Sequence, residues 1–382
     1  MDLGDTALIP PRQDSRTLSV PQAFALARQQ HAAGALDDAR RLYNQILNVV
    51  PDHVEILTML ASIAYRQSQP ERAETYARRG IDLLRRAVQH QPSNAAARAA
   101  LVNLLLAREQ CGEAEALIRD LDIPLNPIRA SAEEFAARRT AGTKRGLPTL
   151  LLATLPKSAS ESIWNKLAEG LNLAQCHFSL GLFPECTLVP ARVHAAATGG
   201  LIVKEHIGAT PHNLETLARD GLTRVIVHHR DPRQATLSWA HFARDDINQR
   251  LMAPLWRKIV PPADILARDL SAILDWCLEY YLPLLIQFLR AWRAVEADPK
   301  QPISVLFSSF EQFRTDPDGY FDRVLSFYDI EKKNYADAAE AEVVHLRKGR
   351  VDEWRSVFTA AQQRRAWERI PADMAADFGW EP

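Results

Sequence analysis

The sequence predicts an α/β fold, in which a parallel sheet flanked by helices follows an all-α region of helical repeats. Two observations lead to this prediction. Residues 21–123 are rich in Ala, Leu, Arg and Gln, whereas from residue 148 onward short apolar runs alternate with helical stretches. Such alternation is typical of parallel strands whose faces are covered by helices. With 382 residues, of which 47% are hydrophobic and 24% charged, the chain can bury more than one core.

Residues 1–20 lack the charged start and apolar stretch of a signal peptide, and Pro10 and Pro11 favour a disordered lead-in. The 4 cysteines have no CxxC spacing, which predicts reduced thiols and no zinc site. We therefore expect a cytoplasmic protein without a bound metal. The apolar run YYLPLLIQFL is too short and too interrupted to predict a membrane span. A net charge of −1 gives no overall field for nucleic acid, so an anion site has to be local.

Residues 21–123 repeat with a period of about 34 residues, the length of a helix–turn–helix unit. Small and apolar residues recur at matching positions, and Pro51 and Pro92 end units because proline cannot donate the next helical hydrogen bond. The pattern resembles a tetratricopeptide (TPR) array of about three units, with an insertion before Pro92 and without the usual Trp and Gly signature. A plain helical bundle without a groove is the alternative. Segment 124–147 is predicted to be a linker to a second domain at 148–382.

The second domain contains the apolar runs TLLLATL, LIVKEH, TRVIVHH and ISVLF, which are predicted strands. In a parallel sheet, ligands collect at the carboxyl ends of the strands, where the amino termini of the following helices point. The residues that follow each run are therefore candidates for a binding site.

The first run is followed by PKSASES, in which a lysine and several hydroxyl residues open a helical pattern. Backbone N–H groups at a helix start have no partners within the helix and bind anionic oxygens, and a neighbouring ammonium adds charge. The segment therefore predicts a phosphate or sulfate site, although a capped helix with a solvated lysine is the alternative. The candidate residues are Lys157, Ser158, Ala159, Ser160 and Ser162.

The third run ends in VIVHHRDPRQATLS, which puts Arg230 at the strand end and Ser238 in the following helix. A guanidinium and a hydroxyl in these positions can bind the same phosphate. A second anion site beside the first indicates a doubly anionic ligand. An ion pair of Arg230 with Asp231 or Asp245 is the alternative.

Three ordered motifs, PKSxxxS, RDPRxxxxS and RKGRVDEW, resemble those of the cytosolic-type sulfotransferases, a family with a P-loop-like fold that uses 3′-phosphoadenosine 5′-phosphosulfate (PAPS). The family's usual motifs are PKSGTTW, RNPKDxxxSxxxF and RKGxxGDW. The segment LFSSFEQFRTDPDGYFDRVLSFYDI also resembles the strand and two helices before the family's third motif. The order of the motifs matches, and so does their spacing.

The resemblance implies an enzyme that moves a sulfuryl group from PAPS to a hydroxyl or amine and releases adenosine 3′,5′-bisphosphate (PAP), without a metal. The PKSASES residues named above would surround the 5′-phosphosulfate, with Lys157 as the donor to the leaving oxygen. Arg230 and Ser238 would bind the 3′-phosphate. Arg347, Lys348 and Gly349 would close over that phosphate from the far side.

The general base is expected at the end of the second run, where the family often has KTHLP and this chain has Lys204, Glu205 and His206. An imidazole with a pKa of about 6.5 is suited to proton abstraction at neutral pH, so the resemblance implies His206. Glu205 competes, because protein-tyrosine and some glycan sulfotransferases use a carboxylate; Glu185 and His212 are further alternatives. A structural histidine bonded to a backbone carbonyl is the other interpretation of His206.

Three residues depart from the family pattern. Ala159 replaces a glycine, Glu161 puts a negative charge beside the anion site, and Trp164 lies two positions beyond the family's adenine-stacking tryptophan. A TPR scaffold or binding protein with a degenerate, inactive sulfotransferase domain is therefore the alternative function. A P-loop kinase is disfavoured because GxxxxGK[ST] is missing.

The acceptor is predicted by class alone. An attached repeat array favours a peptide, protein or glycan over a small molecule, and it equally allows a protein partner or self-association. Segment 243–300 is rich in Trp, Leu and Tyr and is predicted to form helices over the acceptor side, with its aromatic side chains mostly in the core.

Overall fold

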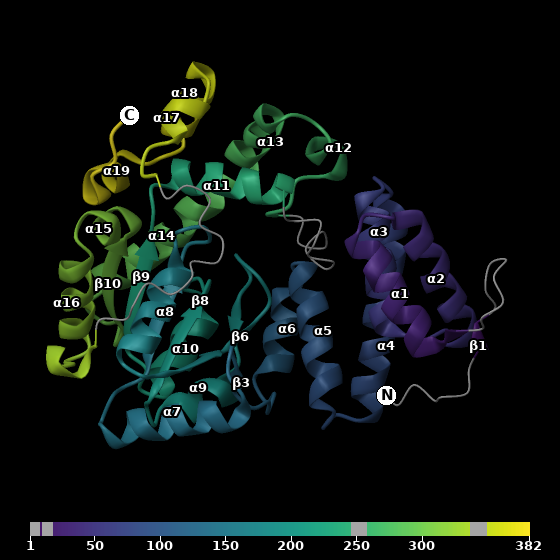
Figure 1. Ribbon diagram of the computed structural model, residues 1–382, viewed down its shortest axis with the longest axis horizontal. Coiled ribbons are helices and arrows are strands. Elements are labelled where there is room, and N and C mark those ends of the chain that lie inside the picture. Colours follow the sequence, from purple (N-terminus) through teal and green to yellow (C-terminus); the bar gives the residue numbers. More distant parts are fainter. Residues whose placement is uncertain (1–7, 10–17, 246–257, 337–349) are drawn as a thin grey trace. The chain divides into compact units, whose positions relative to one another are not determined.

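The computed structural model describes residues 8–9, 18–245, 258–336 and 350–382 (Figure 1). The chain divides into two compact units, and each is described by itself. Unit 1 comprises Met1–Arg108 and Ala240–Ile273, and unit 2 comprises Glu109–Trp239 and Leu274–Pro382. The predicted site residues that the structure describes all belong to unit 2.

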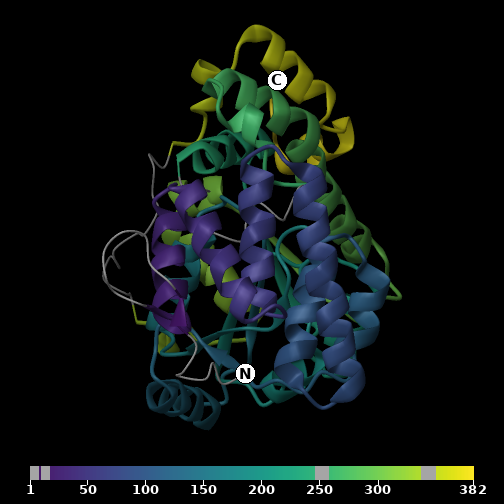
Figure 2. The same ribbon diagram turned by 90° about the vertical axis from the view of Figure 1, so that its right-hand side faces the viewer.

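Unit 1 consists mainly of consecutive helices, each packed against the next from α1 to α5 (Figure 1, Figure 2). Ala23, Ala27 and Ala39 are fully buried in one core with Tyr43 and Ile46. Side chains this small let neighbouring helices approach closely. The helices are α1 (Val20–Ala32), α2 (Leu36–Val49), α3 (Val54–Arg66), α4 (Pro70–His90) and α5 (Ala95–Ala107), and a short α12 (Ala263–Leu266) also belongs to this unit.

Local sequence explains where these helices begin. Ser19 forms a capping box with Gln22, Asn94 caps α5, and Pro70 is the first residue of α4, where its missing N–H is not needed. The insertion predicted before Pro92 lengthens α4. The prediction of a helical region is confirmed, whereas its identity as a TPR array stays a prediction.

The predicted disordered lead-in is described in part. Leu8–Ile9 (β1) pairs antiparallel with Leu18–Ser19 (β2), and α1 begins directly afterwards. We expected these four residues to be disordered, but they form a short antiparallel pair. The other residues of the lead-in before Leu18 lie outside the described part.

Unit 2 contains a six-stranded sheet with the strand order β10-β9-β4-β8-β5-β3. Every neighbouring pair is parallel except β5 with β3. The four apolar runs form the adjacent strands β10, β9, β4 and β8, which confirms the predicted α/β class with a mostly parallel sheet. The strands are β3 (Asn126–Pro127), β4 (Leu150–Thr154), β5 (Ala174–His177), β8 (Leu201–Glu205), β9 (Arg224–His229) and β10 (Ser304–Ser309).

Helices and a small hairpin surround this sheet (Figure 1). The hairpin pairs β6 (Ser179–Leu180) with β7 (Thr187–Leu188). The divisions of the chain into two units fall within helices α11 (Pro232–Asp245) and α13 (Leu270–Trp276). The other helices are α6 (Cys111–Ile118), α7 (Ala132–Lys144), α8 (Ser160–Gly170), α9 (Pro190–Ala196), α10 (Pro211–Arg219), η3 (Cys277–Tyr281), α14 (Leu282–Ala297), α15 (Phe310–Thr315), α16 (Pro317–Phe327), η4 (Lys332–Asn334), α17 (Trp354–Val357), α18 (Ala360–Glu368) and α19 (Ala372–Phe378).

The side chains of β9 alternate between the two layers that cover the sheet. Ile226 packs in one core with Tyr320 of α16, and His228, two residues further on, also contacts Tyr320. His229 has a different neighbour, because its ring packs against that of Phe378 of α19, with 4.4 Å between the centroids and 54° between the ring planes. Adjacent histidines of one strand thus belong to different layers.

Segment 124–147 is part of unit 2, which corrects the predicted linker. Asn126–Pro127 form an edge strand, where the missing N–H of proline is tolerated. Ser131 caps the helix α7 that follows. A Cβ atom added to Gly142 would come within 2.8 Å of the Cα of Gly200, so α7 lies against the turn before β8. The prolines and glycines that indicated a linker are explained by this edge strand and this close contact.

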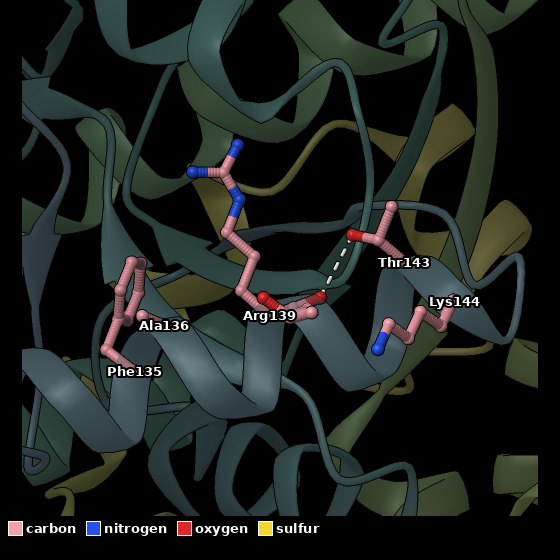
Figure 3. A pocket seen from close by; sticks show the side chains of 6 residues that line it. Phe135, Ala136, Arg139, Thr143 and Lys144 are labelled. Atoms are coloured by element: carbon pink, nitrogen blue, oxygen red, sulfur yellow. Dashed lines mark hydrogen bonds between the residues drawn. The ribbon is translucent and has the colours of Figure 1, made fainter.

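A cavity of about 440 Å³ lies along α7 (Figure 3). Within it, the hydroxyl of Thr143 donates to the carbonyl of Arg139 at 2.9 Å. Because α7 contacts the residue before β8, the cavity lies near the amino end of that strand and away from the carboxyl ends that carry the predicted site. It is lined by Phe135, Ala136, Arg139, Thr140, Thr143 and Lys144.

One continuous helical run, Leu270–Ala297, is long and apolar enough to cross a membrane, with a mean hydropathy of 1.3. It includes the apolar run YYLPLLIQFL and consists of α13, η3 and α14. However, 56% of its most apolar window is buried inside the protein, and the buried core helix of a soluble protein has the same length and composition. The expectation that the chain has no membrane span stays a prediction.

Candidate active site

Three of the predicted site residues, Lys157, His206 and Arg230, follow the carboxyl ends of three adjacent strands. β9, β4 and β8 are neighbours and parallel, so they end at the same edge of the sheet. Lys157 follows β4, His206 follows β8 and Arg230 follows β9. The strand order thus brings together residues that come from three separate segments.

The loop between β4 and α8 contains two residues in the left-handed region. Lys157 has a φ of 66° and Ala159 has a φ of 64°. Ala159 therefore adopts a positive φ, as a glycine readily does, although for a residue with a Cβ atom this costs roughly 1–2 kcal/mol. Left-handed residues within a turn gather successive N–H groups into a concave nest that binds anions. The positive φ angles of Lys157 and Ala159 are compatible with such a nest, and the anion site stays a prediction.

The serines of this loop differ in their surroundings. Ser158 is fully buried, and its Oγ donates to the carbonyl of Leu155 at 2.7 Å, so this hydroxyl stabilises the loop itself. Ser160 is the first residue of α8 and is 5% exposed. Ser162 is half-buried, and its N–H donates to the carbonyl of Ala159 at 3.1 Å. Their roles as ligands of an anion stay predictions.

Arg230 connects the loop after β4 to the third motif. Its guanidinium donates to the carbonyl of Lys157 at 3.2 Å and to the carbonyl of Arg350 at 2.5 Å. It also lies over the ring of Phe310, 4.0 Å from the ring centroid. The predicted ligands Arg347, Lys348 and Gly349 lie outside the described residues, but Arg350 follows them directly. The end of the third motif is therefore adjacent to the first.

The acidic residue next to Arg230 has another partner. Asp231 accepts from Arg233 through both carboxylate oxygens, at 2.7 to 3.2 Å, and Arg233 is 1% exposed. Asp245 pairs with Arg244 at the end of α11. The ion pairs that we considered as alternatives for Arg230 are thus made by other arginines. Ser238 is half-buried in the middle of α11.

Sequence analysis missed the role of Arg233, which belongs to the quoted RDPR motif. Its guanidinium lies over the ring of Trp354, 3.9 Å from the centroid, and donates to the carbonyl of Glu381 at 2.6 Å. The arginine therefore fastens the carboxyl-terminal segment to α11. The second arginine of RDPR is visible in the sequence, but Trp354 and Glu381 are more than a hundred residues away from it.

His206 is held in one tautomer by a backbone carbonyl. Its Nδ1 lies 2.7 Å from the carbonyl oxygen of Thr154 and 3.1 Å from the Thr154 hydroxyl. Because a carbonyl oxygen can only accept, Nδ1 carries the proton and the lone pair of the neutral ring is on Nε2. Burial, and then the charge of Lys204, lower the pKa of His206 to about 4. The ring is therefore neutral and basic at Nε2 at physiological pH.

Glu205 has the contacts of a structural carboxylate. Its Oε1 accepts from the N–H groups of Phe178 and Ser179, and its Oε2 accepts from the Ser179 hydroxyl at 2.6 Å. His177 Nδ1 lies 3.5 Å from Oε1. Burial raises the pKa of Glu205, but these donors lower it by more, so its pKa is below the usual value. These contacts favour His206 as the base. His212, another alternative, lies 2.9 Å through Nε2 from the carbonyl of Leu188.

Glu161 is paired with cations. Its carboxylate accepts from the ammonium of Lys204 and lies 3.3 Å from the guanidinium of Arg129. Burial raises the pKa of Glu161, but Lys204 and then Arg129 lower it by more, so the carboxylate is ionised. Trp164 is 1% exposed, donates to the carbonyl of Ile202 at 3.1 Å, and lies beneath the Lys204 ammonium. The tryptophan whose role was open is therefore a core residue.

Segment 243–300 falls partly on residues that the structure describes. Tyr281 is fully buried and stacks on Trp239, with 4.9 Å between ring centroids, as expected for a core aromatic. Tyr280 is 56% exposed, which differs from that expectation. Trp256 lies outside the described residues.

The described residues contain no cluster of three or more His, Cys, Asp or Glu side chains that could hold a metal ion. Among the cysteines, Cys176, Cys186 and Cys277 are buried free thiols, and burial raises the pKa of each. They are packing residues, as their spacing suggested.

Comparison with known proteins identifies no family for the chain. No family model matches it, and no curated protein matches it either. Among solved structures, a mouse sulfotransferase, SULT7A1, which was crystallised in complex with PAP, aligns with 67% of this chain and 97% of its own. The two share 16% sequence identity, and the TM-score is 0.43. A likeness of this degree says nothing about what this chain binds, so its function has to be inferred from the contacts of the site.

Proposed function

We propose that the chain is a sulfotransferase that moves a sulfuryl group from PAPS to a hydroxyl or amine of an acceptor. The observation that carries the proposal is the position of Arg230, whose guanidinium joins the carbonyl of Lys157 in the first motif to that of Arg350 beside the third. Three segments that are distant in sequence, and that match a family's motifs in order, meet at one edge of a sheet. A parallel sheet alone brings the ends of β4 and β9 together, and the contact of Arg230 with the carbonyl of Arg350 adds the third segment.

We assign the two phosphate-bearing ends of the donor to the two sides of this edge. Lys157, the backbone N–H groups from Ser158 to Glu161 and the hydroxyls of Ser160 and Ser162 would hold the 5′-phosphosulfate, since positive φ angles such as those of Lys157 and Ala159 occur in turns whose N–H groups bind anions. Arg230 and Ser238 would hold the 3′-phosphate, together with Arg347, Lys348 and Gly349. A phosphate at this position would accept charge-assisted hydrogen bonds from the Arg230 guanidinium, whose planar fork of donors matches phosphate geometry.

The transfer needs a base and a group that neutralises the leaving oxygen. His206 Nε2 takes the proton of the acceptor hydroxyl while the acceptor oxygen forms its bond to sulfur. The bond between sulfur and the bridging oxygen breaks, its electron pair leaves with PAP, and the ammonium of Lys157 neutralises the charge that develops there. His206 ends the step protonated and returns its proton to water.

The proposal extends to the setting of the reaction. The helices of unit 1 offer more surface than a small acceptor needs, so we propose a peptide, protein or glycan as the acceptor, and a protein partner or self-association through this unit. The spacing of the buried free thiols suits a reducing compartment, and we propose a cytoplasmic location.

Titration of the protein with PAP in a calorimeter tests the proposal. Saturable binding is expected, and it should be weaker for adenosine diphosphate, which lacks the 3′-phosphate that Arg230 would hold. A well-folded protein that binds neither compound would rule the proposal out. A screen of acceptors with sulfur-labelled PAPS then identifies the substrate class.

A binding or scaffold protein with an inactive transferase domain is the second candidate. The observation that favours it is the Glu161–Lys204 ion pair, which puts a carboxylate in the first turn of α8, beside the proposed phosphosulfate site. This candidate predicts that PAP binds weakly or not at all, and that no acceptor is sulfated even when unit 1 captures a partner.

A further inference from the structure

His228 contacts the backbone of the loop between β4 and α8, residues 155–159, which we call the anion-binding loop. The side chain is fully buried, and its Nε2 lies 2.9 Å from the carbonyl oxygen of Ser158. On the other side of the ring, Nδ1 lies 3.0 Å from the hydroxyl of Ser308 and 3.1 Å from that of Tyr320. These two hydroxyls are also 3.2 Å apart. One buried network therefore links β9, β10 and α16 to the loop after β4.

The chemistry of these partners fixes the tautomer of His228. A carbonyl oxygen can only accept, so Nε2 carries the proton and donates to Ser158. Nδ1 then accepts from one hydroxyl, and the other hydroxyl can donate to the first. Every polar atom of the ring is thus satisfied while the imidazole is neutral. Burial also lowers the pKa of His228 to about 4, so this neutral form is the one present at physiological pH.

His228 contacts Ser158, which lies in the most strained part of the loop. Ser158 lies between Lys157 and Ala159, the two residues of the loop with positive φ. Backbone in this region is strained for residues other than glycine and persists only where its surroundings over-determine it. Ser158 is fixed from two directions, since its own hydroxyl donates to Leu155 and its carbonyl accepts from His228.

We propose that His228 is a positioning residue for the anion-binding loop. By donating to the carbonyl of Ser158, it keeps the loop in the conformation in which Lys157 and the first N–H groups of α8 face a bound anion. The identity of that anion, the 5′-phosphosulfate, rests on the proposed function, whereas the hold on the loop does not.

The chain offers a matched control for this proposal. His229 is the next residue, is 4% exposed, and has its ring against Phe378 instead of the loop. The variant His228→Asn is too short to reach the carbonyl of Ser158, whereas His228→Gln can place an N–H near the position of Nε2. His229→Asn disturbs the same strand to a similar degree without touching the loop.

Two measurements on the full chain test the proposal. The first is calorimetric titration with PAP, in which His228→Asn should bind about three- to tenfold more weakly than the wild type, the loss expected for one hydrogen bond. His228→Gln should recover most of the affinity, and His229→Asn should stay within about twofold of the wild type. The second is hydrogen exchange of a peptide covering residues 156–162 in the ligand-free protein, which should be faster in His228→Asn alone.

The outcomes separate this proposal from the proposed function. If the wild type does not bind PAP, the proposed function fails, and the exchange measurement alone decides the role of His228. Equal effects of His228→Asn and His229→Asn on both measurements, without rescue by His228→Gln, would mean that His228 is an ordinary core residue. If His228→Asn does not fold, His228→Phe keeps an aromatic ring in the core but removes the donor to Ser158, and unchanged exchange of residues 156–162 in that variant would overturn the proposal.

Discussion

The two sides of the candidate site hold their cations in different ways. At the end of β9, the guanidinium of Arg230 is bonded to neutral carbonyl oxygens, and the neighbouring Asp231 is bonded to Arg233. At the end of β8, the ammonium of Lys204 is bonded to the carboxylate of Glu161. An anion that binds Lys204 on the β8 side has to compete with the Glu161 carboxylate for the ammonium. An anion on the β9 side would accept from a guanidinium that already bonds to the carbonyl oxygens of Lys157 and Arg350. We therefore expect the two sides to respond differently to an anion.

The largest effect is expected at His206, which distinguishes chemistry from binding. His206→Ala should lower kcat about 100- to 10,000-fold, the range for loss of a general base, while the affinity for PAP changes by less than about twofold. His229→Ala is the control, because it also removes a buried histidine, whose ring lies against Phe378. Full activity of His206→Ala would transfer the role to Glu205, to be tested with Glu205→Gln.

The β9 side is tested next, through its arginine. Arg230→Ala should weaken PAP binding about ten- to a hundredfold, because hydrogen bonds to charged groups contribute roughly 1.5–3 kcal/mol. Arg230→Lys should recover part of this, since it keeps the charge but loses the fork of donors. Arg224→Ala removes an arginine from the opposite end of the same strand, where it pairs with Asp329, and should leave the titration unchanged. Equal losses in the two alanine variants would contradict the assignment of the 3′-phosphate.

The pH dependence of the reaction tests the β8 side. His206 acts as a base in its neutral form, and its pKa is lowered to about 4, so kcat/KM should stay level from pH 8 down to about pH 5 and fall below that. At pH 5, an ordinary imidazole would be protonated and the rate about thirtyfold lower. Lys204→Met removes a cation that lowers this pKa, so the acid limb should move to higher pH. Two results would contradict His206 as the base: a fall of kcat/KM at the same pH in Lys204→Met as in the wild type, or a fall near pH 6.5 in the wild type.

The fold could be predicted where strands are buried on both faces. Such strands read as continuous apolar runs, and β4, β8 and β9 were predicted for this reason. The edge strand β10 is mostly half-buried, but its apolar run also predicted it. β5 was missed because its sequence, AQCH, alternates buried and half-buried residues over four positions, and β3 has two residues and hence no pattern. The linker was predicted from its Pro and Gly residues. The same residue types also occur in edge strands and where helices make close contacts, so composition alone does not distinguish these cases from a linker.

The location of the site in the fold could be predicted from the sequence, but the side-chain contacts of its residues could not. Lys157, His206 and Arg230 follow predicted strands, so their gathering at one edge followed from the fold class. Three other arrangements depend on side-chain directions in segments that are distant in sequence. They are the pairing of Arg233 with Trp354, the pairing of Glu161 with Lys204, and the bond from His228 to Ser158. No local pattern encodes such directions.

The smallest expected effect concerns Glu161. It tests whether the ion pair between Glu161 and Lys204 lowers the affinity of the site for PAP. Glu161→Gln removes a carboxylate from the first turn of α8 and releases Lys204, so PAP affinity should rise about three- to tenfold if the loop binds the 5′-phosphate. Glu169→Gln is the matched control, because Glu169 is exposed near the other end of the same helix. A rise in both variants would indicate a general effect of net charge. A fall in Glu161→Gln alone would mean that the ion pair with Lys204 supports the loop, and the contrast between the two sides would then be one of structure and not of readiness to bind.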